Sequence, residues 1–159
     1  MKRYGLCCWL LILFSPLSWG HLERNAPVEI NSDYAQYHHP TGVATHRGQV
    51  KMVYSTTTLL ADQLDIYRDP AGEIQKFLAT GQPATLESTM ASLAAALTGQ
   101  AQSIYYLPQE GLFVLEGQAQ IQQGADTLNA PKITLDIEQQ AIYSERDSTS
   151  RPSMIMQSH

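Results

Sequence analysis

The sequence predicts an all-β fold built from two copies of one antiparallel unit, and three observations support this. A stretch that opens with Gly48-Gln49 recurs without a gap from Gly117-Gln118, an offset of 69 residues (117 − 48). Within both stretches apolar and polar residues alternate, which is the period of a half-buried strand. Glycine, proline and aspartate gather between the alternating segments, where strands would turn. The combination favours a sandwich, a roll or a barrel.

The similarity between the copies extends well beyond the opening dipeptide. At the same offset, similar residues coincide as follows: Met52 with Ile121, Thr58-Leu59 with Thr127-Leu128, Ala61 with Ala130, Leu64 with Ile133, Ile66 with Leu135 and Pro83 with Pro152. A fixed period indicates one supersecondary unit used twice, each copy being unable to bury its apolar face alone.

The first 20 residues predict a secretory signal peptide and not a part of the fold. Lys2-Arg3 gives a basic start, Leu6 to Phe14 is an uninterrupted apolar run, and Ser18-Trp19-Gly20 offers small residues before a cleavage at His21. We therefore expect a signal peptide at residues 1–20 and one β-domain at residues 21–159. The alternative is a retained membrane anchor, since residues 4–20 could almost span a bilayer. The shortness of the run and the proline at position 16 favour cleavage.

Cysteine usage and charge narrow the class further. Cys7 and Cys8, the two cysteines of the chain, both lie in the expected signal peptide, so the remaining domain would have no disulfide or thiolate metal site. Without Lys2 and Arg3, eight basic residues face 15 acidic ones, a net charge of −7. The lysines and arginines are scattered and form no basic cluster. Nucleic-acid binding is not expected, because phosphate contacts need a basic footprint.

The strands follow in order from alternation and turn residues. We expect them at residues 28–37, 43–54, 58–67, 73–79, 84–88, 101–107, 112–122, 127–138, 141–146 and 153–157. Turns are predicted at residues 38–42, 68–72, 108–111 and 124–126, and Gly81-Gln82-Pro83 is expected to separate two strands. Residues 90–97 are alanine-rich but short for a helix, and we predict an extended connection there.

No catalytic or metal-binding constellation is visible. The sequence has no GxSxG, HExxH or CxxC motif and no phosphate-binding glycine loop, so we expect no enzyme activity, no cofactor and no metal. His38, His39 and His46 could suggest a metal site, but a solvated turn and one strand histidine explain them without it. Asp62 and Asp65 are expected on opposite faces of a strand, where they could not act together.

The apolar face is the remaining candidate site. Alternation and the repeat place one set of side chains inward, together with Ala119: Val28, Ile30, Val50, Met52, Leu64, Ile66, Leu86, Ile104, Tyr106, Phe113, Leu115, Ile121, Ile133 and Leu135. From alternation alone, the simpler interpretation is that these side chains fill one another's gaps in a closed sandwich.

Several short motifs give the chain a resemblance to a known family. In order, they are Pro27-Val-Glu-Ile-Asn-Ser-Asp33, Gly48-Gln-Val-Lys-Met52, Leu60-Ala-Asp62, Thr80-Gly-Gln-Pro-Ala-Thr-Leu86, Leu115-Glu-Gly-Gln-Ala119 and Ile121-Gln-Gln123. With these motifs, residues 27–157 resemble the periplasmic lipopolysaccharide-transport proteins of the LptA/OstA family. Two features depart from it: Ala130-Pro131-Lys132 predicts an edge or a bulge, and there is no basic C-terminal tail.

The resemblance implies a twisted, open β-jellyroll whose inward set lines an apolar groove for the acyl chains of lipopolysaccharide. It implies a protein of the Gram-negative periplasm that joins end to end into a bridge between inner-membrane and outer-membrane transport components. Val28, Ile30, Leu86 and Tyr106 fall where residues of the family's groove lie. Two alternatives stay open: a membrane-anchored relative of the same pathway, and a structural or adhesive β-domain with a closed core.

The last predicted strand is a candidate assembly edge. Ser153 to Ser158 carries no charge, whereas natural sheets usually protect an edge with charges, bulges or proline. The first strand would be its partner in another copy, and such a heterologous contact gives open filaments unless it closes. The expected assembly residues are Val28, Ile30, Met154, Ile155 and Met156.

Overall fold

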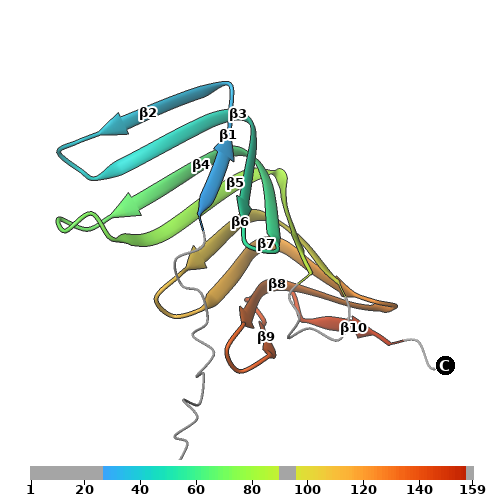
Figure 1. The fold of residues 1–159 in the computed structure, drawn as a ribbon. Helices are drawn as coiled ribbons and strands as arrows, with labels where there is room; N and C mark the ends of the chain where they lie inside the picture. The colour runs from blue at the N-terminus through green and yellow to red at the C-terminus, as the bar shows by residue number, and fades with distance from the viewer. Residues whose placement is uncertain (1–26, 90–95, 157–159) are drawn as a thin grey trace, which may run out of the picture.

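Ten strands form one antiparallel sheet in the computed structural model, which describes residues 27–89 and 96–156 (Figure 1). No helix occurs in this part of the chain. The strands are β1 (Val28–Asn31), β2 (Tyr34–His38), β3 (Val43–Tyr54), β4 (Thr57–Arg68), β5 (Ile74–Ser88), β6 (Leu97–Leu107), β7 (Leu112–Gln123), β8 (Asp126–Asp136), β9 (Ala141–Glu145) and β10 (Ser153–Ile155).

The strand order leaves the sheet open at both sides. Its main path is β1-β3-β4-β5-β6-β7-β8-β10, while β2 also pairs with β3 and β9 also pairs with β8. Consecutive long strands are hydrogen-bonded neighbours, as short turns between antiparallel strands require. One side therefore ends in β1 and β2, and the other ends in β9 and β10. The predicted all-β, open jellyroll-like fold is confirmed.

Each long strand bends near its middle, so the single sheet folds over into two leaves (Figure 1). The register shifts at this level in every pair of long strands, for example between Arg47 and Val50 of β3 and between Glu116 and Ala119 of β7. An extra residue on one strand bends it and increases its twist. We call residues 34–47, 63–80, 103–116 and 132–145 the β2–β9 leaf, and the remaining strand residues the β1–β10 leaf.

The predicted repeat is reproduced in the pairing register. Val28 pairs with Tyr54, and 69 positions later Leu97 pairs with Gln123. Val50 likewise pairs with Ala61, as Ala119 does with Ala130. The continuous strand β6 thus corresponds to β1 and β2 together, and the first repeat ends with β5, whose place in the second repeat is taken by β9 and β10.

The structure corrects several strand boundaries. Gly81-Gln82-Pro83 does not end a strand, because β5 runs from Ile74 to Ser88 and absorbs these residues in a register shift. The first strand is interrupted at Ser32-Asp33, where the Asp33 amide donates to the carbonyl of Gly48 at the bend of β3. Strand β6 begins at Leu97 and not at residue 101. Residues 1–20 and 90–95, which carry the signal-peptide and connection predictions, lie outside the described residues.

Candidate functional site

The space between the two leaves is filled by apolar side chains. Of the fourteen inward positions predicted from the sequence, Val28 and Ile30 are half-buried against the core, and the other twelve are at most 6% exposed. The burial of this set is as predicted. In this structure the set forms a packed core, so a groove open to a ligand would require the two leaves to separate.

Alternation missed part of the core because the buried parity changes at the bend. Strand β4 buries Thr57, Leu59 and Ala61 before the bend but Leu64 and Ile66 after it. Strands β5 and β6 change parity in the same way, so a single period along each strand could not find both sets. The missed apolar residues are Leu59, Ala61, Phe77, Ala79, Ala84, Leu97, Ala101 and Ala130. The same change turns Asp62 and Asp65 to the same outer face, contrary to prediction.

An aromatic row lies in the interior near the tips of β5, β6 and β7, away from the bend. Phe77, Tyr106 and Phe113 lie opposite one another on β5, β6 and β7, with ring centroids 5.9 and 4.4 Å apart. Tyr54 reaches Tyr106 from the other leaf, at 5.6 Å between centroids. Burial raises the pKa of Tyr106, and the neighbouring Tyr54 raises it further. This row is therefore a point where the two leaves touch.

The buried polar groups of the interior are paired. The hydroxyls of Thr57 and Ser88 lie 3.0 Å apart where β4 begins and β5 ends. Asp136 is buried beside a turn, where its Oδ1 accepts from the amide of Gln139 at 2.8 Å. An unpaired buried polar group would cost free energy. Because Thr57, Ser88 and Asp136 are hydrogen-bonded, their burial beside the apolar core does not carry that cost.

One histidine faces inward at the N-terminal side. His46 lies on the same face of β3 as Val50 and Met52 and is partly buried. Its Nδ1 lies 3.1 Å from the Ser32 hydroxyl, which donates to the carbonyl of Tyr34 and therefore accepts from His46. His38 is the exposed last residue of β2, and His39 lies in the exposed turn that follows. Within the described residues, no three His, Cys, Asp or Glu side chains gather as metal ligands.

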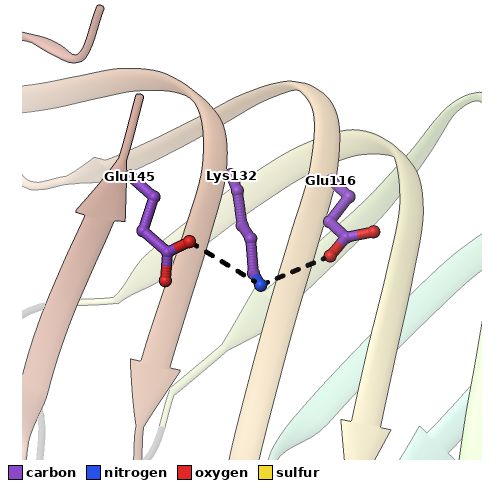
Figure 2. Close-up of polar contacts among 3 residues, drawn as sticks. All are labelled: Glu116, Lys132 and Glu145. Atoms are coloured by element: carbon purple, nitrogen blue, oxygen red, sulfur yellow. Dashed lines mark ion pairs between the residues drawn. The ribbon is translucent and has the colours of Figure 1, made fainter. Parts of the chain in front are cut away.

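The outer face of the β2–β9 leaf is polar and closely paired. Lys132 lies between Glu116 at 3.6 Å and Glu145 at 3.9 Å, on three neighbouring strands (Figure 2). The Lys76 ammonium lies over the rings of Tyr67 and Tyr105. Burial raises the pKa of Tyr105, and Glu116 raises it further. These side chains are partners of one another, which is typical of a solvated sheet face.

Both open edges of the sheet expose their strands. Met154, Ile155 and Met156 are 59%, 61% and 71% exposed at the β10 side. All five residues of β2 are exposed at the other side. Pro131 lies between the segments of β8 that pair with β9 and β10, and it is the single residue opposite Gly117 and Gln118 of β7. Of the predicted edge or bulge, the structure therefore has a bulge, and its extra residue is on β7, opposite the proline.

Comparison with known proteins places the chain beside lipopolysaccharide-transport proteins. The family described as "LptA/(LptD N-terminal domain) LPS transport protein" matches residues 29–141. The lipopolysaccharide export system protein LptH of Pseudomonas aeruginosa is 26% identical over 129 residues, which cover 81% of this chain and 74% of LptH. The crystal structure of LptH from the same species, a periplasmic component homologous to LptA, superposes with a TM-score of 0.78 and 24% identity. It covers 86% of this chain and 99% of the other.

None of the described residues forms a helix with the length and apolar character needed to cross a bilayer.

Proposed function

Because the chain belongs to the LptA/(LptD N-terminal domain) family of LPS transport proteins, we propose that it carries lipopolysaccharide through the periplasm. The acyl chains lie between the two leaves, and the sugars stay in water. The observation that carries this proposal is the interior itself, which is aliphatic and aromatic across both leaves while the sheet around it is open. A sheet that is not closed can admit a chain-like ligand along its side.

The physics of the cargo favours a conduit over a storage site. An acyl chain of ten methylenes gains about 8 kcal/mol on leaving water, at about 0.8 kcal/mol per methylene. Several chains together exceed the ~20 kcal/mol that limits reversible non-covalent binding. The lipid therefore cannot cross water freely, and a protein that moves it needs an interior that resembles the membrane. A largely aliphatic lining, with the aromatic row of Phe77, Tyr106 and Phe113 at one end, suits this task.

Loading requires the leaves to part. Each leaf is held internally by ladder hydrogen bonds, whereas between the leaves the contacts are side-chain packing, such as Tyr54 on Tyr106. A lipid that replaces these contacts with its own methylenes exchanges one apolar environment for another. The net cost of opening a loaded interior is therefore small compared with exposing it to water.

The transport role also requires other proteins at both ends. We propose that copies join through β10 of one and β1 of the next, using Val28, Ile30, Met154, Ile155 and Met156. The resulting chain of copies reaches the inner-membrane and outer-membrane transport components. Deleting residues 152–159 should leave a folded chain that no longer grows in size with concentration. Light scattering across a concentration series measures this, and unchanged oligomers would contradict the assembly edge.

Secretion with removal of residues 1–20 belongs to the same proposal. The intact mass of the protein purified from the periplasm should correspond to a chain that begins at His21. A mass that retains the first 20 residues would instead favour the membrane-anchored alternative.

The test of the cargo is binding of purified lipopolysaccharide. We expect saturable binding, competed by lipid A and not by the detached polysaccharide, because the acyl chains supply the affinity. A folded protein that neither copurifies with lipid nor binds it in titration would support the alternative of a structural or adhesive domain with a closed core.

A further inference from the structure

The two leaves are displaced relative to each other, so each leaves part of its inner face uncovered. On the β2–β9 leaf, inward residues are buried from β4 to β8, and exposure is greatest at the β2 end, where Tyr37 is 48% exposed against 37% for Ile142 on β9. On the β1–β10 leaf the exposed end is the opposite one, where Met154 and Met156 lie. Figure 1 shows β2 and the first half of β3 projecting away from the body of the molecule, far from β10.

One contact fixes the direction of the displacement. Tyr106 on β6 of the β2–β9 leaf touches Tyr54 on β3 of the β1–β10 leaf. Near the strand tips, β6 of the β2–β9 leaf thus covers β3 of the β1–β10 leaf, which lies three places earlier in the strand order. By the same geometry, β2 and the first half of β3 would cover strands that precede β1, and no such strands exist within one copy.

A second copy can supply them in a defined register. Inside the chain, the repeats join where β5 pairs with β6, with Leu86 opposite Gly99. Gly99 corresponds to Ile30 of β1. Leu86 pairs with Leu59, whose counterpart Leu128 pairs with Met154 of β10. Continuing the repeat from one copy to the next therefore places Met154 opposite Ile30.

We propose that the projecting segment of one copy, residues 34–47, covers the inner face of β7 and β8, next to the exposed β10, in its neighbour and completes a lipid site that neither copy closes alone. This proposal rests on the end-to-end assembly of the proposed function. Tyr37 and Gln123 are the counterparts of Tyr106 and Tyr54, respectively. The Tyr54–Tyr106 contact inside the chain is therefore repeated between copies as Tyr37 of one against Gln123 of the other.

The junction differs chemically from the rest of the interior. At the counterparts of Ile104, Phe113 and Leu115, which are all buried, the projecting segment carries Ala35, Ala44 and His46. Smaller side chains leave more space there, and the imidazole adds a polar group beside Ser32. The composite site is thus wider and more polar than the centre of either copy, which suits the place where the acyl chains meet the polar headgroup.

Cross-linking between single-cysteine chains tests the register. In full-length chains with Cys7 and Cys8 replaced by Ser, Tyr37→Cys is mixed with differently tagged Gln123→Cys and treated with a short bis-maleimide. Both positions are at least partly exposed, so the variants should fold. We expect a cross-linked heterodimer in severalfold excess over that from Gln36→Cys, which points to the opposite face. Tyr54→Cys/Tyr106→Cys in one chain gives the reference for the spacing.

A second pair separates this proposal from the assembly on which it rests. Ile30→Cys mixed with Met154→Cys reports the pairing of β1 with β10 alone. Cross-linking of that pair without Tyr37–Gln123 product would overturn the composite site and leave the assembly standing. If neither pair reacts above the Gln36 control, the assembly and the composite site are both wrong.

Discussion

The first and second repeats have the same backbone and different interiors. Gly48 and Gln49 have φ values of 78° and 43°, and their counterparts Gly117 and Gln118 have 81° and 51°. Yet Phe113 and Leu115 of the second repeat are fully buried, whereas Ala44 and His46 of the first are only partly so. The bend thus depends on a Gly-Gln pair that can adopt left-handed backbone angles. The inward side chains instead depend on whether the repeat is the first or the second in the chain.

The position of each repeat explains the difference. Repeats that stack in one dimension cover one another, and terminal repeats lack a neighbour on one side. The second repeat has its β2–β9 leaf covered by the β1–β10 leaf of the first. In the first repeat, β2 and the first half of β3 have no such cover within the chain, so large apolar side chains there would be exposed to water, as Tyr37 is at 48%. Alanine and histidine at these positions avoid that cost.

The largest difference in stability between the repeats should appear when a charge is placed at equivalent positions of the two. Ile104 is fully buried, so Ile104→Asp should lower the free energy of unfolding by at least ~3 kcal/mol and abolish lipid binding. Its counterpart Ala35 is exposed, so Ala35→Asp should change stability by less than ~0.5 kcal/mol. Urea denaturation with lipid titration measures both. A folded Ile104→Asp variant that binds lipid normally would contradict the assigned interior.

The bend glycines should respond alike, because the repeats share their backbone. A Cβ at Gly48 would collide with the Asp33 side chain, and one at Gly117 with Gln102, the counterpart of Asp33. With positive φ at both, Gly48→Ala and Gly117→Ala should each cost ~1–3 kcal/mol. Denaturation midpoints compare them. A variant that is as stable as the wild type would show that its bend does not require glycine.

A smaller effect is expected on the outer face. Lys132 and its two glutamates are partly exposed, so Lys132→Ala should cost less than ~1 kcal/mol, and added salt should reduce the difference. The matched variant in the first repeat is Gln63→Ala, which removes an uncharged side chain that accepts a hydrogen bond from Arg47 and donates one to Asp65. Its effect should depend less on salt, and an equal salt dependence would contradict an ionic origin for the Lys132 effect.

The smallest effect concerns alkaline pH. Burial raises the pKa of Tyr106, so folding favours its neutral form. This stabilisation is complete below the ordinary tyrosine value of about 10 and is lost as pH rises through the raised pKa. Tyr106→Phe should therefore flatten the fall of the unfolding temperature above pH ~10, with Tyr37→Phe as the control. Part of the slope should persist, because Tyr105 also has a raised pKa. An unchanged slope would contradict the burial of the Tyr106 hydroxyl.

Much of this architecture could be predicted because repetition is visible in the residues themselves. The 69-residue offset predicted two units, and alternation found inward residues such as Met52 and Ile133. Alternation could not find Phe77 or Leu97, because the bend changes the buried parity within a strand. The interruption at Ser32-Asp33 was also hidden, since it depends on an amide that bonds to the distant Gly48. Both misses come from the bend, which is a tertiary feature.

The central claim is that lipid acyl chains lie between the two leaves. Photocross-linking in lipopolysaccharide-producing cells tests it most directly, with a small diazirine amino acid placed at Leu86 or, as the control, at its outward neighbour Thr85. We predict a lipopolysaccharide adduct from Leu86 and none from Thr85. The absence of an adduct from a folded Leu86 variant, or equal adducts from both positions, would contradict the claim.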